Sequence, residues 1–166
     1  MLMLKQDDPR KCTAAKLVKF GLAIDVHKTS TKTLVLDPFA EKTLLNKDKK
    51  LISSITGIDC SWNLADKTFV KKFTGIRRKL PPLFAGNPVN YSKLNKLTTV
   101  EAISAALYVL GYSDLSLKIL DKFKWGHTFY ELNKELLDAY SKIDSENKIS
   151  PLLHEFGISI EKLKLN

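Results

Sequence analysis

A carboxylate and an indole follow a short apolar run in the segment Gly57-Ile58-Asp59-Cys60-Ser61-Trp62. Side chains just past a buried strand can face a ligand, so Asp59 could touch a bound molecule while Trp62 walls an apolar pocket. The structural alternative is that Asp59 or Ser61 caps the next helix and that Trp62 packs in the core. The residues alone favour the structural alternative without excluding the other.

A second candidate site is the stretch LPPLFAGNPVNYSKLNKLTTVEA, from Leu80 to Ala102. It predicts a buried strand at 83–85, a loop rich in turn formers, and the start of a long helix. The Asn87-Pro88 pair favours an extended or turn conformation in that loop. The loop keeps backbone N–H and C=O groups near the carboxyl end of a strand, where open α/β sheets bind ligands.

The sequence lacks several motifs that would indicate other chemistries. There is no Walker loop, no GxGxxG and no G-x-S-x-G. The three histidines lack the spacing of metal ligands, and two cysteines, Cys12 and Cys60, are too few for a structural zinc or iron–sulfur site. We therefore expect no metal.

The charge balance points to a polyanionic partner. The 166 residues include 27 Lys and Arg against 18 Asp and Glu, a formal net charge of +9. A lysine-rich soluble surface, as in thermophile proteins, is the alternative. No apolar run approaches the ~20 residues of a membrane span, and MLMLK is too short for a signal peptide. A cytoplasmic protein is expected.

The basic residues gather in three clusters that suggest a phosphate track around one site. The clusters are Arg10, Lys11, Lys16 and Lys19; Lys71, Lys72, Arg77, Arg78 and Lys79; and Lys93 with Lys96. Tyr91 could stack on an extruded base or could equally pack in the core.

The expected fold class is α/β, with a mostly parallel sheet and short helices in residues 1–87 and an all-helical part in 88–166. Apolar and β-branched runs predict strands at 1–5, 22–26, 33–36, 57–60 and 83–85. Caps and helical spacing predict helices at 14–20, 47–54, within 64–73, from the capping box Thr98-x-x-Glu101 to Gly111, and at 113–123, 128–143 and 151–163.

Five segments in order resemble the ribosomal-RNA aminocarboxypropyltransferases. They are DPRKCTAAKL (8–17), LDPFAEK (36–42), GIDCSWN (57–63), the 80–102 stretch and FKWGHTFYELN (123–133). The resemblance implies a SPOUT-like fold with a deep trefoil knot. It also implies transfer of the 3-amino-3-carboxypropyl group from S-adenosylmethionine to N1-methylpseudouridine in small-subunit ribosomal RNA, with methylthioadenosine as co-product and the chain acting as a monomer.

The resemblance also supplies a set of site residues. It implies cofactor contacts at Thr13, Ile58, Trp62, Ala65, Leu80, Asn95 and Thr99, several of them through the main chain. Trp62 and Ala65 would wall off the methyl group, and Thr13 would meet the carboxylate. The position of Asn95 is often aromatic in relatives, so the expected contact of Asn95 is made by its main chain and not by a stacked ring. Expected RNA contacts are Arg10, Lys11, Lys16, Arg77, Arg78, Lys79, Lys93 and Lys96.

Asp59 is the expected catalytic residue, with two possible roles. It could help to deprotonate a uracil-type ring nitrogen, or it could pair with the ammonium group of the donor. A carboxylate of ordinary pKa is a poor base for such a proton, which slightly favours the ammonium role. Two other functions remain open: a knotted RNA methyltransferase, and a non-enzymatic RNA-binding protein of ribosome assembly.

Overall fold

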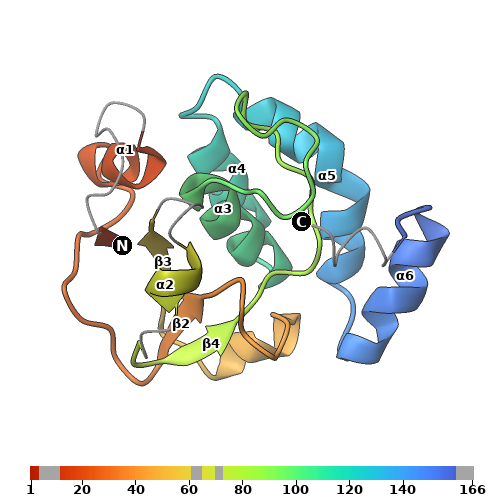
Figure 1. Ribbon diagram of the computed structural model, residues 1–166, viewed down its shortest axis with the longest axis horizontal. Coiled ribbons are helices and arrows are strands. Elements are labelled where there is room, and N and C mark those ends of the chain that lie inside the picture. Colours follow the sequence, from red (N-terminus) through yellow and green to blue (C-terminus); the bar gives the residue numbers. More distant parts are fainter. Residues whose placement is uncertain (4–11, 61–64, 70–72, 160–166) are drawn as a thin grey trace.

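Four parallel strands form the sheet of the described structure (Figure 1). The computed structural model describes residues 1–3, 12–60, 65–69 and 73–159. The strands are β1 (Leu2–Met3), β2 (Thr33–Leu36), β3 (Ser54–Asp59) and β4 (Ile76–Arg78), in the order β1-β3-β2-β4. Leu36 pairs with both Gly57 and Arg78, so β2, β3 and β4 end at one edge of the sheet.

Helices bury both faces of this sheet, as is usual for parallel strands. They are α1 (Thr13–Lys19), α2 (Ala65–Phe69), α3 (Thr99–Val109), α4 (Ser113–Leu120), α5 (Gly126–Tyr140) and α6 (Ile149–Glu155), with 3-10 turns η1 (Asn46–Lys50) and η3 (Glu146–Lys148). Leu34 and Leu36 join the large core built with α3 to α5, whereas Val35 packs with α2 on the opposite face. This alternation follows from the period of two along a strand.

The α/β class, the parallel pairing and the helix-rich second half are confirmed. The capping box is also confirmed: the Thr98 hydroxyl accepts from the Glu101 N–H at 3.4 Å, and Glu101 reaches back to the Thr98 N–H. Gly21 ends α1 with a positive φ of 68°, a conformation that glycine adopts without strain. The predicted division at residue 87 stays a prediction; the main hydrophobic core draws side chains from both parts.

Two predicted strands are wrong. Among the described residues, 22–26 make isolated hydrogen bonds, such as the Val26 N–H to the Met1 carbonyl at 2.9 Å and the Leu22 N–H to the Leu17 carbonyl at 3.0 Å, and form no ladder. Residues 83–85 form a single antiparallel bridge, Phe84 with Leu94, instead of joining the sheet. Both segments are apolar enough to look like strands, but within the described residues no partner strand runs beside them for more than one pair.

The sheet instead gains β4, which sequence reasoning treated as a basic cluster. Its two arginines each pair with a carboxylate buried beside the sheet. Arg77 forms an ion pair with Asp37, whose side chain has no exposed surface. Arg78 makes a two-pronged contact with Asp48, at 2.9 and 3.1 Å. These charged partners allow an arginine-rich segment to serve as a strand.

The segment from Pro82 to Thr98 is tied to the helices by three side chains. The Tyr140 hydroxyl donates to the Pro82 carbonyl at 2.9 Å. Asn133 accepts from the Phe84 N–H and donates to its carbonyl, both at 2.8 Å, so a side-chain amide replaces a neighbouring strand. Glu101 supplies the third tie, to the loop at residues 86–87.

Glu101 is fully buried and accepts five hydrogen bonds. The donors are the N–H groups of Gly86 (2.7 Å), Asn87 (2.9 Å) and Thr98 (2.6 Å), the Asn87 amide (2.8 Å) and the Thr98 hydroxyl (2.8 Å). Burial raises the pKa of Glu101 above its ordinary value, while these donors act in the opposite direction. One carboxylate thus caps α3 and fixes both ends of the loop before it.

Replacing Glu101 by alanine leaves these donors buried without an acceptor. We expect Glu101→Ala to lower the free energy of unfolding by roughly 3–5 kcal/mol, measured by urea denaturation. The control is Glu131→Ala, on the exposed side of α5, where a change within about 0.5 kcal/mol is expected. Equal stability of the two variants would refute the anchoring role of Glu101.

Arg77 offers a second stability test. Arg77→Ala leaves the buried Asp37 carboxylate without its cation. The loss should lie near the low end of roughly 3–5 kcal/mol, because about a third of the Arg77 side chain is exposed. Lys42→Ala, at an exposed position, serves as the control in the same urea titration. Wild-type stability of Arg77→Ala would show that this arginine has no structural role.

Candidate functional site

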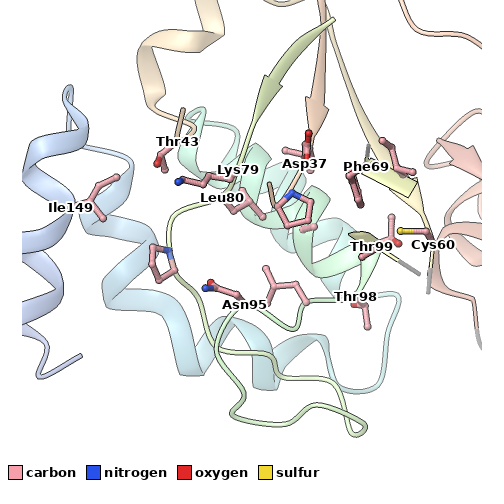
Figure 2. Close-up of a pocket in the computed structure, with 18 of the residues that line it drawn as sticks. Asp37, Thr43, Cys60, Phe69, Lys79, Leu80, Asn95, Thr98, Thr99 and Ile149 are labelled. Atoms are coloured by element: carbon pink, nitrogen blue, oxygen red, sulfur yellow. The ribbon is translucent and has the colours of Figure 1, made fainter. Parts of the chain in front are cut away.

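A cavity of about 510 Å³ lies at the edge of the sheet where β2, β3 and β4 end (Figure 2). Its remaining walls come from α2, from the residues just after β4, from the first turn of α3 and from α6. This is the edge at which open parallel sheets bind ligands. The volume is within the roughly 300–1,000 Å³ of small-molecule sites.

Part of the wall is apolar. Ile58 comes from β3, Ala65 and Phe69 from α2, and Leu80 and Leu97 from the segment between β4 and α3. Phe69 is itself supported by the exposed ring of Phe39, with ring centroids 5.8 Å apart. Such a surface suits a flat ring or an uncharged carbon chain.

Polar groups line the rest of the cavity. Lys79, Asn95 and Thr99 project from three different segments toward the same space (Figure 2). Thr43 and Glu146 lie on the side near α6. A few convergent polar groups in a mostly apolar cavity are what fixes the orientation of a small ligand.

Five of the seven predicted cofactor residues line this cavity: Ile58, Ala65, Leu80, Asn95 and Thr99. Trp62 lies outside the described residues. Thr13 is buried at the start of α1, and its hydroxyl accepts from the Val100 N–H at 3.4 Å, which joins α1 to α3. The side-chain roles implied for these residues stay predictions.

The backbone accounts for the asparagine at position 95. Asn95 has a φ of 62°, in the left-handed region that asparagine tolerates better than most residues. Its N–H donates to the Leu83 carbonyl at 2.8 Å, and its side-chain oxygen accepts from the Leu83 N–H at 3.4 Å. The residue therefore supports the cavity wall through local hydrogen bonds.

Asp59 lies at the end of β3, held by α1 and α3. It accepts from the Cys12 thiol at 3.1 Å and from the Thr99 hydroxyl at 3.4 Å. Among the described residues, the cavity wall includes Ile58, Cys60 and Thr99 but not Asp59. Thr99 touches both the cavity and the carboxylate, so a ligand at Thr99 lies close to Asp59.

The two cysteines differ in their surroundings, and neither forms a disulfide. Burial and the neighbouring Asp59 raise the pKa of Cys12 to about 11. At neutral pH its thiol is therefore protonated and donates to Asp59, while its sulfur accepts from the Ala15 N–H at 3.2 Å and caps α1. Cys60 is half-buried and lines the cavity.

Sequence reasoning missed the wall formed by α6. Ile149, Ser150 and Leu153 reach the cavity from residues far from every motif. Glu146, just before α6, accepts a hydrogen bond from the Thr43 N–H and so ties this wall to the sheet. Burial alone would raise the pKa of Glu146, but the Thr43 N–H and the nearby Lys79 charge lower it overall. No sequence signal identifies a contact across a hundred residues.

The predicted RNA-binding residues separate into two groups. Arg77 and Arg78 are held in ion pairs beside the sheet, as described above. Lys79 lines the cavity, whereas Lys93 is exposed and Lys16 and Lys96 are half-buried. Arg10 and Lys11 lie outside the described residues. Their RNA contacts stay predictions.

The position of Tyr91 separates the two alternatives left open for it. Its side chain is 57% exposed, so core packing is excluded and a surface role remains.

Among the described residues, no helix is long and apolar enough to cross a membrane. Nor does this part of the chain hold a cluster of three or more His, Cys, Asp or Glu that could bind a metal ion.

Two family models match the chain. "Ribosome biogenesis protein, C-terminal" covers residues 34–157, which includes most of the cavity wall. "Possible Fer4-like domain in RNase L inhibitor, RLI" covers residues 1–30. That second stretch contains one cysteine, Cys12, and so cannot supply the four thiolates of an iron–sulfur cluster.

Similar proteins and structures agree with the first model. The 16S rRNA aminocarboxypropyltransferase of Sulfurisphaera tokodaii is 44% identical over 160 residues, 95% of this chain and 92% of the relative. That of Saccharolobus solfataricus is also 44% identical, over 95% and 93% of the two chains. A solved structure, the SAM-dependent rRNA:acp-transferase Tsr3 from Vulcanisaeta distributa, superposes with a TM-score of 0.85 at 36% identity. The match covers 97% of this chain and 89% of that one.

The resemblance of the sequence motifs to this family is therefore confirmed. The sequence match covers 95% of this chain and the structural match covers 97%. The cavity is formed by the sheet edge, the 80–98 segment and α3. The chain belongs to the 16S rRNA aminocarboxypropyltransferase family, a family of enzymes.

Proposed function

We propose that this chain transfers the 3-amino-3-carboxypropyl group from S-adenosylmethionine to small-subunit ribosomal RNA. The observation that carries the proposal is the cavity at the sheet edge, which brings together five residues expected to contact the donor. The activity named for the relatives and the SAM dependence of the structural neighbour support the same assignment. The excess of basic residues fits an RNA substrate.

The cavity fits this donor in size and chemistry. Its apolar wall, including Leu80 and Leu97, offers a surface for an adenine ring. Ile58, Asn95 and Thr99 line the same cavity, and in this proposal they contact the ribose and base, in part through the main chain. In this proposal Ala65 and Trp62, which lies three residues before it in the sequence, shield the methyl group of the donor from the acceptor and leave the first carbon of the amino-acid chain exposed.

The reaction is a displacement at that carbon. A ring nitrogen of the acceptor forms the new N–C bond as the C–S bond breaks, and the electron pair stays on sulfur in a neutral thioether. The ring N–H proton leaves to a base or to water. The protein contributes orientation and exclusion of water, and no covalent intermediate is needed.

We propose that Asp59 orients the donor by accepting a hydrogen bond from the ammonium group of S-adenosylmethionine. Thr13 would contact the carboxylate group of the same donor. The Cys12 thiol and the Thr99 hydroxyl both donate to Asp59 and hold its carboxylate beside the cavity. Because the pKa of Cys12 is about 11, this thiol stays a donor throughout the neutral range. Residues at the starts of α1 and α3 thus fix the orientation of the Asp59 carboxylate.

The finer parts of the proposal are the acceptor base and the topology. We propose N1-methylpseudouridine as the base and the cytoplasm as the place of action, with a single chain as the active unit.

We also propose a deep trefoil knot. Its support is the resemblance of the sequence motifs to the family. A crystal structure in which the backbone trace contains no knot would contradict this proposal.

The co-product decides between the proposed reaction and methyl transfer. Incubation of the chain with S-adenosylmethionine and unmodified small-subunit ribosomal RNA should release methylthioadenosine, detected by mass spectrometry. S-adenosylhomocysteine would identify a methyltransferase instead. Absence of any S-adenosylmethionine binding in calorimetry would leave the non-enzymatic RNA-binding alternative.

Asp59→Asn separates the two roles of the carboxylate. Loss of a charge-assisted contact with the ammonium group should weaken S-adenosylmethionine binding on the order of 10- to 150-fold, with a slower single turnover. Calorimetry measures the first effect and rapid quenching the second. Cys12→Ser is the control, since a hydroxyl keeps both the donor to Asp59 and the cap of α1. Unchanged affinity with a slower turnover would assign Asp59 as a base.

A further inference from the structure

An aromatic patch with lysines on both sides lies at the far end of α1 from Asp59. Phe20, just after α1, meets Phe123 edge to face with ring centroids 6.2 Å apart. Phe123 in turn contacts Trp125 at 5.6 Å. The two segments are about a hundred residues apart in sequence, and Figure 1 shows α1 beside the connection from α4 to α5.

The outer ring of this patch, Phe20, is largely exposed. Phe123 is buried and Trp125 is half-buried, but 48% of Phe20 faces solvent. The hydrogen bonds that end α1, Gly21 N–H to Val18 and Leu22 N–H to Leu17, fix the backbone on which Phe20 sits. The ring is therefore presented on a rigid support rather than on a loose loop.

Lysines border the rings on both segments. Lys16 and Lys19 lie on α1, and Lys122 and Lys124 flank Phe123. Within the described part of the chain these four amines make no ion pair. The nearby acidic group, Asp121, lies 4.0 Å from His127, and both are exposed. Among the described residues, the patch thus combines an exposed aromatic ring with four lysines that make no ion pair.

We propose that this patch, formed by Lys16, Lys19, Phe20, Lys122, Lys124 and Trp125, binds the single-stranded RNA that flanks the modified nucleotide. Exposed aromatic rings stack bases and lysines neutralise phosphates, which is how proteins hold single strands. The inference rests on the proposed function, which places the reaction near Asp59 and makes the ligand RNA.

The geometry connects the patch to the proposed site. Cys12, the cap of α1, donates to Asp59, and Phe20 follows the last residue of the same helix. A helix of this length spans roughly 10 Å, at 1.5 Å per residue. About two nucleotides of an extended strand cover that distance, so the patch would hold a base close to the one that reacts.

The test is binding of a fluorescein-labelled oligouridine of about 12 nucleotides, followed by anisotropy at several salt concentrations. The double variant Lys122→Ala with Lys124→Ala should lower the magnitude of the log–log salt slope by about 1.4, since each phosphate contact on a single strand contributes about 0.7. The matched control, Lys28→Ala with Lys32→Ala, removes two exposed lysines away from the cavity and should keep the wild-type slope.

Phe20→Ala tests the stacking part separately. It should weaken binding on the order of 5- to 150-fold while leaving the salt slope unchanged. Leu51→Ala is its control, because that side chain is 53% exposed and lies outside the patch. If Phe20→Ala fails to fold, Phe20→Leu keeps an apolar contact with Phe123 but removes the aromatic face.

S-adenosylmethionine affinity separates failure of this inference from failure of the proposed function. All patch variants should bind S-adenosylmethionine like the wild type. If the wild type binds both ligands and the patch variants bind RNA equally well, the patch is not the RNA surface. If the wild type binds no RNA, or no S-adenosylmethionine, the proposed function itself is wrong and the inference falls with it.

Discussion

The buried carboxylate of Glu101 organises the part of the molecule on which the cavity depends. Its five donors come from residues 86–87 and from Thr98. Glu101 therefore holds both ends of the 86–98 segment at the start of α3. Leu97 lies within this closed segment, Thr98 ends it and Thr99 follows it, and all three line the cavity. Burial opposes the charge while the donors favour it, so the site is held by a group that tolerates little rearrangement.

Local signals predicted the parts of the fold that local chemistry determines. The capping box at Thr98, the glycine ends of α1 and α3, and the strand at 33–36 depend on a few neighbouring residues, and all are found. The errors arise where a distant partner decides. Residues 83–85 are satisfied by the side chain of Asn133 and by residues 92–95, and β4 exists because Asp37 and Asp48 neutralise its arginines. Neither partner can be identified from sequence spacing.

The candidate site shows the same division. The family resemblance implied seven cofactor residues, and five of them line one cavity. The wall from α6 and the bond between Glu146 and Thr43 carried no motif. The contact of Cys12 with Asp59 likewise joins two motifs that were predicted separately. Tertiary contact gives these residues their roles, since the Cys12 thiol donates to Asp59 only because the fold brings the two together.

The positive charge of the chain is divided by residue type. Two of the three arginines, Arg77 and Arg78, hold buried carboxylates through the planar geometry that favours paired contacts. Lysines supply most of the remaining charge, and those beside Phe20 and Phe123 stay at the surface. The amine of lysine is a strongly hydrated charge on a flexible side chain. Such lysines therefore attract RNA phosphates without fixing the RNA rigidly. The net charge of +9 thus overstates the number of cations near the cavity that remain for RNA.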